Sequence, residues 1–450
     1  MILYLYVFEN QYHVQDMRQA IAIGFAVIAS ISVHAQLSFD GAAYEAVAVS
    51  PAASTGLEKV YVVNNAQGMS ISYSTGTAVK WSRFGANGAA YAEELGTATS
   101  IELSADDCGY IAETEGRAHY YWVVNYANHH LAINSVTPSA EQADCMRTQL
   151  DIDGSGDRIT YYTINGRPEE LSREIELSYN TLVYDADAAV YQQQETKVEL
   201  GYIRPVVAVD APLCDTRFTV SGDRFLKAWN MPVSVESPMY ATSAVAAETS
   251  AQQERREVDN EQRVDAAELG GSAPCDIEFT AVTTDAAVFH EWQFALNPEF
   301  DPIDDRYTEN VVNYTFRNQG TTYVRFFAAD ESGRCEFTGP VYQVVIGESS
   351  LLCPNAFTPE SSPGVNDEWK VSYKSIVSFE CHIFNRWGTE MFSFTDPSVG
   401  WDGKYKGKYV PAGTYFYVIK ARGADGRDYK LSGDINIIKS KSINQTDTTE

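Results

Sequence analysis

The chain has 450 residues, long enough for three or more domains at the usual size of roughly 100–200 residues each. Its 33 basic and 61 acidic side chains give a formal net charge of −28, so the phosphate backbone of a nucleic acid would repel it. The 28 Tyr and 20 Phe residues, with Val, Ile and Thr alternating with polar residues, are typical of β-structure. The composition therefore predicts an all-β protein and excludes nucleic acid as its partner.

An export signal is predicted near the N-terminus. Arg18 supplies a positive charge, residues 20–32 form an apolar run, and Val33 and Ala35 are the small residues that signal peptidase requires. The run is shorter than the roughly 18–20 residues of a membrane anchor, and no later segment is long and apolar enough to span a bilayer. The predicted segments are an upstream mis-assigned start at residues 1–16, a signal peptide at 17–35 and a mature chain from Gln36.

Seven cysteines follow in the exported part, where disulfides can form. None of their spacings is a zinc-type CxxC, and the odd number leaves at least one without a partner in the chain. Cys275 and Cys335 bracket one predicted sandwich and are the expected disulfide, while Cys353 and Cys381 are candidates for cross-strand neighbours. No pairing is assigned to the remaining cysteines, which are Cys108, Cys145 and Cys214.

Short β-rich segments separated by Gly and Asn recur upstream of residue 348, as in tandem β-sandwiches. Trp81 is expected to be the core tryptophan of the first sandwich. An excursion rich in Ala, Gln, Glu and Arg, which precedes the last of these sandwiches, has too few large apolar residues to hold a core. The predicted domains are an Ig-like β-sandwich at 36–137, a β-sandwich at 140–211, a β-rich segment with the excursion at 212–273, and a further sandwich at 274–347.

The last of these sandwiches contains the stretch YTFRNQGTTYVRFFAADESGRC, residues 314–335. A turn at residues 318–320 leads into a strand that is expected to be buried, and a cysteine closes the stretch. This arrangement resembles the PKD-like sandwich modules of bacterial surface proteins. The resemblance implies a PKD-like fold for residues 274–347.

Four sequence blocks stand in order near the C-terminus: CPNAFTPESSPGVNDEWK (353–370), IFNRWGTEMF (383–392), GWDGKYKGKYVPAGTYFYVIKA (400–421) and SGDINIIKS (432–440). Together they resemble the gliding motility-associated C-terminal domain of Bacteroidota, the type B sorting domain of the type IX secretion system. The resemblance covers residues 348–441 and leaves a tail at 442–450. The matching positions are Asn355, Phe357, Thr358, Pro359, Asn366, Asp367, Phe384, Asn385, Arg386, Trp387, Gly388, Trp401, Asp402, Gly403, Pro411, Gly413 and Tyr415.

The resemblance implies a small C-terminal β-sandwich that serves as the export address. It also implies the type IX secretion machinery as a partner, with a PorP/SprF-like outer-membrane protein, and a location on the cell surface or outside the cell. One block departs from the family, because the loop before Asn366 reads ESSPGV instead of an Asn/Gly/Asp-rich sequence. A metal-binding role for that loop is therefore not carried over.

Within the second block, Phe384 is expected to face the core, while Asn385 and Gly388 shape a turn. Arg386 is expected to stack on a neighbouring tryptophan, Trp387 or Trp401, or to bond a backbone carbonyl.

Two roles remain open for the motif residues: they hold the domain together, or some of them contact the translocon or an anionic surface. The candidates for such contact are Arg386 with Lys404, Lys406 and Lys408, although lysines on an edge strand also discourage aggregation.

The only pattern suggestive of a metal site is DIDGSGDRIT, residues 151–160. Asp151, Asp153 and Asp157 have the spacing of the first half of a calcium loop, but the twelfth position is Tyr162 where the bidentate Glu should stand. An Asp/Gly turn between strands is the favoured interpretation. The chain contains no G-x-S-x-G, H-E-x-x-H, Walker or G-x-G-x-x-G pattern, so neither an enzyme nor a cofactor is predicted.

The sequence therefore favours an exported, multi-domain structural or adhesion-type protein that the C-terminal domain delivers across the outer membrane. The alternative is a glycan-binding surface protein, in which exposed aromatic residues such as Trp122 or Trp229 would form a platform.

Overall fold

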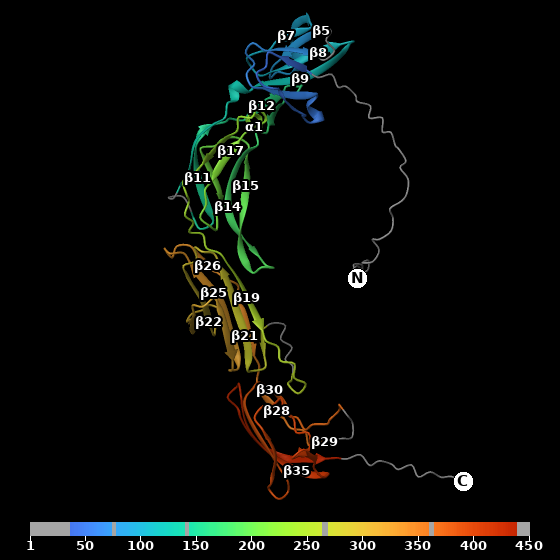
Figure 1. The fold of residues 1–450 in the computed structure, drawn as a ribbon, viewed down its shortest axis with the longest axis vertical. Coiled ribbons are helices and arrows are strands. Elements are labelled where there is room, and N and C mark those ends of the chain that lie inside the picture. Colours follow the sequence, from blue (N-terminus) through green and yellow to red (C-terminus); the bar gives the residue numbers. More distant parts are fainter. Residues whose placement is uncertain (1–36, 74–77, 140–143, 263–268, 360–363, 439–450) are drawn as a thin grey trace, which may run out of the picture. The chain divides into compact units, whose positions relative to one another are not determined.

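The computed structural model describes residues 37–73, 78–139, 144–262, 269–359 and 364–438, which are almost entirely β-structure (Figure 1). This confirms the all-β fold class. The predicted upstream start, the signal peptide, Gln36 and the tail at 442–450 lie outside the described residues. Among the helices of the described residues, none has the length and apolar character needed to cross a membrane. The contacts divide the chain into two units, one of residues 1–125 with 162–168 and one of residues 126–161 with 169–450.

The first unit contains a six-stranded sheet of order β2-β3-β9-β8-β5-β6 and a three-stranded sheet of order β1-β4-β7. Trp81 is fully buried in the apolar cluster of this unit, as predicted, and its indole N–H donates to the carbonyl of Ala98 at 3.1 Å. Its elements are β1 (Leu37–Asp40), β2 (Val47–Val49), η1 (Ala53–Thr55), β3 (Lys59–Val63), β4 (Ser70–Tyr73), β5 (Val79–Phe84), η2 (Ala89–Tyr91), β6 (Glu93–Ala98), β7 (Ser100–Glu102), β8 (Cys108–Thr114) and β9 (Arg117–Asn125).

The second unit begins with the second module, residues 126–161 and 169–244, which contains sheets of order β10-β11-β16 and β15-β14-β17-β18. The residues between these two ranges, 162–168, belong to the first unit. Because β17 pairs with β14, the strands of this module continue past residue 211, where the sequence analysis placed a boundary. Its elements are η3 (Tyr126–His129), β10 (Ala132–Ser139), β11 (Arg147–Ser155), β12 (Ile159–Tyr162), β13 (Pro168–Leu171), β14 (Ile175–Asp185), β15 (Val190–Leu200), β16 (Val206–Asp210), β17 (Thr219–Gly222), α1 (Arg224–Ala228) and β18 (Val233–Glu236).

A fully buried ion pair lies inside the second module. The guanidinium of Arg173 lies 2.8 Å from the carboxylate of Asp223, and both side chains have no exposed surface. Arg173 also donates to the carbonyls of His129 and Asp157, and the hydroxyl of Tyr126 donates to Asp223. Asp223 in turn caps the short helix α1 by accepting from the backbone N–H of Leu226. These hydrogen bonds satisfy the two charges, which would otherwise be costly to bury.

The third module, residues 245–347, has sheets of order β19-β21-β24 and β20-β27-β25-β22-β23, and β26 pairs with β25. Aromatic side chains from both sheets fill the core, with Trp292 fully buried beside Phe279 and Phe326. The Gln-rich start of the excursion is a regular strand, β19, because it pairs with β21 over seven residues. The elements are β19 (Ala247–Gln253), β20 (Leu269–Gly271), β21 (Cys275–Thr283), β22 (Phe289–Ala295), β23 (Asp305–Tyr307), β24 (Val311–Phe316), β25 (Gly320–Ala329), β26 (Glu336–Thr338) and β27 (Tyr342–Ile346).

The predicted disulfide between Cys275 and Cys335 is wrong. Cys335 is bonded to Cys145 of the second module, and Cys275 is a buried free thiol. Cys275 begins β21 beside Phe316, whereas Cys335 follows the end of β25, where Ala329 pairs with the start of β22. The two cysteines therefore lie toward opposite ends of the sandwich, although a disulfide requires Cα atoms within about 7 Å.

The C-terminal module, residues 348–438, is built on a five-stranded sheet of order β29-β36-β35-β31-β32, with two small two-stranded sheets, β28-β30 and β33-β34. Its core contains Trp369 and Trp401. The elements are β28 (Ser350–Leu352), β29 (Ala356–Phe357), β30 (Ser372–Lys374), β31 (Ile376–Phe384), β32 (Glu390–Phe394), β33 (Lys404–Tyr405), β34 (Lys408–Tyr409), β35 (Gly413–Gly423) and β36 (Asp428–Ile437).

The later part of the excursion lies along the C-terminal module. The backbone N–H of Gln262 donates to the carbonyl of Tyr373 at 2.7 Å, and the N–H of Tyr373 donates to the carbonyl of Asn260 at 3.1 Å. The side-chain amide of Asn260 donates to the carbonyls of Val371 and Pro397, both at 2.8 Å. Residues 260–262, which belong to a segment without an apolar core of its own, thus pair with β30 in the manner of a strand.

Candidate functional site: a cationic aromatic groove on the C-terminal module

Three of the sequence-predicted motif residues form the buried centre of the C-terminal module. The Trp401 ring lies 5.6 Å from the ring of Phe357 and 5.2 Å from that of Tyr415, measured between centroids. The Trp401 indole N–H donates to the carbonyl of Lys404, and the Tyr415 hydroxyl donates to the carbonyl of Pro411. These residues act structurally, because their rings fill the core and their polar atoms are satisfied inside it.

The turn after Trp401 requires its glycine. Gly403 has φ +74°, and a Cβ there would lie 3.0 Å from Cγ of Pro359 and 3.2 Å from Cζ of Phe357. The Asp402 carboxylate accepts from the backbone N–H of Lys404 at 3.0 Å, which fixes the entry to β33. The motif residues Asp402, Gly403 and Pro359 therefore meet in one close-packed turn.

The first block also makes backbone hydrogen bonds within the module. The carbonyl of Asn355 accepts from the N–H of Asn436 at 2.9 Å, and the carbonyl of Asn366 accepts from the N–H of Thr358 at 2.9 Å. Asn366 has φ +55°, a conformation that Asn tolerates better than most residues. The carboxylate of Asp367 accepts from the N–H of Gly364. These residues shape the loop between β29 and β30.

The second block forms the hairpin tip between β31 and β32. The side-chain oxygen of Asn385 accepts from the N–H groups of Trp387 and Thr389, both at 3.0 Å, and Gly388 has φ +79°. This turn directs Trp387 into solvent, where its side chain is 77% exposed. The guanidinium of Arg386 stacks on the Trp387 ring with its central carbon 4.6 Å from the centroid. The expected roles of Asn385 and Gly388 in the turn, and the stacking of Arg386 on Trp387, agree with this geometry.

Trp387 differs from all the other tryptophans of the chain. The remaining six are each at most 5% exposed: Trp81, Trp122, Trp229, Trp292, Trp369 and Trp401. Tryptophan is enriched among the residues that dominate the binding energy of protein interfaces. This observation identifies the surroundings of Trp387 as the candidate functional site.

A groove of about 780 Å³ lies beside Trp387, between the β31–β32 hairpin, the β33–β34 hairpin and the start of β35. Six of the predicted motif residues line it: Asn385, Arg386, Trp387, Pro411, Gly413 and Tyr415. Four further lining residues with large apolar side chains were not predicted: Met391, Tyr405, Tyr409 and Phe416. Tyr405 and Tyr409 could have been found from the alternation of Tyr and Lys around Gly407, of which only the lysines were predicted to make contact.

The groove carries positive charge from Arg386, Lys406 and Lys408, and no acidic residue is among the side chains that line it. Lys404 is differently placed, because its ammonium group is paired with Asp402 at 2.7 Å. Burial raises the pKa of Tyr415, and the nearby Arg386 cation partly opposes this rise. The arrangement therefore suits a partner that combines negative charge with a flat apolar surface.

Phe384 was predicted to face the core and does not. Along β31 the buried side chains are Phe379, Cys381 and Ile383, so the alternation of the strand places Phe384 on the opposite face. There it is half-buried, with the His382 ring stacked on it at 6.2 Å between centroids.

The weak calcium candidates are not in a loop. Asp151 and Asp153 lie within β11, on the exposed face of the strand, and the Asp153 carboxylate accepts from the amide of Asn134. Asp157 follows the end of this strand and uses its carbonyl to bind Arg173. Across the described ranges, no group of three or more His, Cys, Asp or Glu side chains is placed to hold a metal ion.

The proposed glycan platform is also absent at the named residues. Trp122 is buried against Phe84 and Tyr162 in the first unit, and Trp229 is buried against Tyr126 in the second module. Both rings are core residues, so neither can stack on a sugar.

Three solved structures are distantly similar to this chain. The three N-terminal domains of the highly immunogenic outer capsid protein (Hoc) of bacteriophage RB49 align at 12% identity over 70% of this chain and 100% of that chain, with a TM-score of 0.20. Dimeric latent PorU from Porphyromonas gingivalis aligns at 9% identity over 72% of this chain and 35% of that chain, with a TM-score of 0.15. A Ca²⁺-stabilized adhesin that helps an Antarctic bacterium bind ice aligns at 11% identity over 88% and 100%, with a TM-score of 0.18. Such low scores support no inference about function.

Two family comparisons are informative. Residues 136–237 match the fibronectin type III domain, and residues 351–437 match the CHU_C type IX secretion signal domain. No curated protein matches the chain. The first match falls on the second module and the second on the module that carries the groove. The chain thus combines a fibronectin type III-like domain with a type IX secretion signal domain, and the latter implies export to the cell surface or the extracellular space.

Proposed function

We propose that this protein is an exported multi-domain structural protein of adhesion type, delivered across the outer membrane by its C-terminal module. The match of residues 351–437 to the type IX secretion signal domain is the observation that carries this proposal. The β-sandwich modules upstream, one of them fibronectin type III-like, fit a protein that displays its loops outside the cell.

Within this route, the groove beside Trp387 is the surface that the secretion machinery contacts. Tryptophan, arginine and tyrosine dominate the binding energy of protein interfaces, and the groove presents Trp387, Arg386 and Tyr409 together. Because its charged residues are all basic, the expected partner offers an acidic surface. A PorP/SprF-like outer-membrane protein, which the resemblance to type B sorting domains of Bacteroidota implies, is the proposed partner.

The proposal extends to the rest of the chain. Residues 17–35 act as the signal peptide that takes the protein across the inner membrane, as their charge and apolar run suggest. The role is non-catalytic, a view that rests on the lack of catalytic sequence patterns. A structural or adhesive role is preferred to glycan binding because Trp122 and Trp229, the suggested platform, are buried.

Surface display of groove variants tests the proposal. The double variant Arg386→Ala/Trp387→Ala removes the exposed stack, and we expect it to fold normally but to accumulate in the periplasm. Arg427→Ala is the matched control, because Arg427 is exposed and stacks on Tyr429 at 4.9 Å in the same module but does not line the groove. Protease shaving of intact cells measures display. Wild-type display of the groove variant would remove the groove from the export mechanism.

A further inference from the structure

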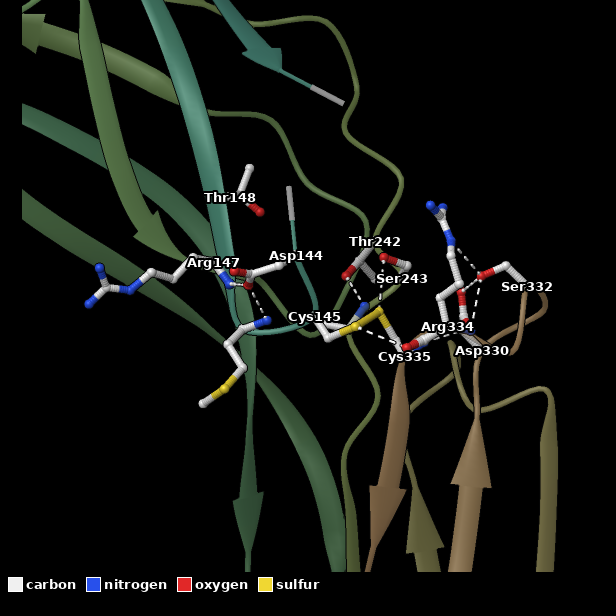
Figure 2. The surroundings of a disulfide bond; sticks show 12 residues. Asp144, Cys145, Arg147, Thr148, Thr242, Ser243, Asp330, Ser332, Arg334 and Cys335 are labelled. Atoms are coloured by element: carbon white, nitrogen blue, oxygen red, sulfur yellow. Dashed lines mark hydrogen bonds between the residues drawn. A yellow bond between two sulfur atoms is a disulfide. The ribbon is translucent and has the colours of Figure 1, made fainter. Parts of the chain in front are cut away.

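The disulfide between Cys145 and Cys335 joins the second module to the third (Figure 2). Cys145 lies just before β11, and Cys335 lies between β25 and β26. The two residues are 190 positions apart in the sequence, and their Cα atoms are 5.2 Å apart. The bond therefore closes a very long covalent loop, which contains most of both modules.

Each cysteine is held by a turn of its own module. On one side, the Asp144 carboxylate accepts from the N–H groups of Met146 and Arg147, at 2.8 and 2.6 Å. On the other side, the Asp330 carboxylate accepts from the N–H groups of Arg334 and Cys335, at 2.9 and 3.0 Å. Figure 2 shows both turns facing the sulfur atoms. The two thiols are thus positioned by hydrogen bonds that do not depend on the bond between them.

The chain segment that joins the two modules, residues 242–246 (the linker), passes beside the disulfide. Cys335 Sγ lies 3.6 Å from the hydroxyl of Ser243, a linker residue (Figure 2). The linker is tied to the second module through the N–H of Thr242, which donates to Asp215, and to the third through the N–H of Ala246, which donates to Thr284. The modules therefore have two covalent connections side by side, the linker and the disulfide.

We propose that the Cys145–Cys335 bond is a mechanical bypass that shields the two modules from extension. When the chain is pulled from its ends, tension passes from residue 145 to residue 335 through the sulfur atoms. Residues 146–334, which include β11–β18 and β19–β25, then lie outside the path of the force. Of the described elements of these two modules, η3 and β10 of the second and β26 and β27 of the third remain in that path. Tension of this kind arises if the displayed protein is held at one end and pulled at the other, a setting that rests on the proposed function.

The size of the effect follows from the length of the loop. A fully extended chain spans at most about 3.3–3.6 Å per residue, so a closed loop of 190 residues withholds about 630–680 Å of extension. This difference in extended length is far larger than any difference that the strands outside the loop could produce.

Single-molecule pulling of the full chain, tethered at its two ends, tests the bypass. The protein is fully extended with and without a phosphine reductant, which takes the oxygen of a water molecule while the two sulfurs each receive a proton. We expect the untreated protein to be about 630–680 Å shorter at full extension than the reduced protein. Cys145→Ser/Cys335→Ser should have the longer length without reductant.

Cys214→Ser is the control, because Cys214 lies within the loop but its thiol is free. This variant should keep the shorter length and the full response to the reductant. Equal lengths for the untreated and reduced wild-type protein would overturn the proposal, and so would loss of the response in Cys214→Ser. The measurement uses purified protein and no secretion step. A negative result would therefore contradict the bypass and leave the export proposal unaffected, and failure of the export proposal would leave the pulling result unaffected.

Discussion

Trp369 and Trp401 exchange two backbone hydrogen bonds across the C-terminal module, at 2.9 and 3.0 Å, and both indole rings are fully buried. Trp387, the third tryptophan of the module, is in solvent on a hairpin tip. The same sequence motif therefore supplies both the core that holds the domain and the ring that is free to contact a partner.

Replacing Trp401 and Trp387 should separate these two roles. Trp401→Ala is expected to destabilise the C-terminal module by about 3–5 kcal/mol, because it empties a core position. Trp387→Ala should change stability by no more than about 0.5 kcal/mol, as is usual for an exposed side chain. Hydrogen exchange of the β35 and β36 amides in the full chain reports the stability of this module. Equal losses in the two variants would mean that Trp387 is structural.

Glycine at position 403 should be necessary for stability. Gly403→Ala places a side chain at positive φ and pushes its Cβ against Pro359 and Phe357, so a loss of at least about 1–3 kcal/mol is expected. Gly407→Ala has almost the same φ, +77°, but no atom within 4 Å of its Cβ, and it should lose less. The same exchange measurement compares them. Equal losses would show that contact with Pro359 and Phe357 contributes nothing.

The buried ion pair should dominate the stability of the second module. Arg173→Met leaves Asp223 buried without its partner, which is expected to destabilise the module by about 3–5 kcal/mol. Arg217→Met is the control, because Arg217 pairs with Glu236 at the surface. This variant should leave the stability of the module, and so its amide exchange, unchanged. Hydrogen exchange of β14 and β17 measures both. A small effect of Arg173→Met would mean that water reaches Asp223.

The C-terminal module should gain stability from a protonated histidine. A hydrogen bond to Glu380 is the largest effect and raises the pKa of His382 above its ordinary value of 6.5. Burial opposes this rise, and a further hydrogen bond to Glu390 adds to it. Because the folded pKa is the higher one, this stabilisation is fully present below about pH 6.5 and is lost as the pH rises through the folded pKa.

NMR titration of the His382 ring in the full chain measures that pKa, and His382→Gln should abolish the associated pH dependence of amide exchange in β31. A pKa at or below 6.5 would contradict the expected stabilisation.

Much of the fold could be predicted because alternation along a strand depends only on local sequence. Trp81 was identified as a core residue in this way. The side of β31 that faces the core was predicted wrongly. Ile383 and Phe384 are both apolar and adjacent, so packing against the other strands decides which of them is buried. The polar strand β19 was missed because its pairing with β21, and not its apolar content, holds it in the sheet.

The site and the disulfide depended on distances that the sequence does not contain. The pairing of Cys145 with Cys335 is set by how the second and third modules meet. The prediction compared only cysteines at the two ends of one module, so it could not identify a bond between modules. The exposure of Trp387 is set by the turn around Asn385 and Gly388, and sequence reasoning left open whether this ring was buried. The division of the motif residues between core and groove required the three-dimensional structure.

The most direct test of the central claim is the location of the protein after residues 348–450 are deleted. Surface exposure is measured by protease shaving of intact cells, alongside the periplasmic fraction. Non-reducing peptide mapping of the truncated protein shows whether its second and third modules have folded, because both Cys145 and Cys335 are retained. The account predicts a disulfide-bonded protein that accumulates in the periplasm and is missing from the surface. Normal surface display of the truncated protein would contradict it.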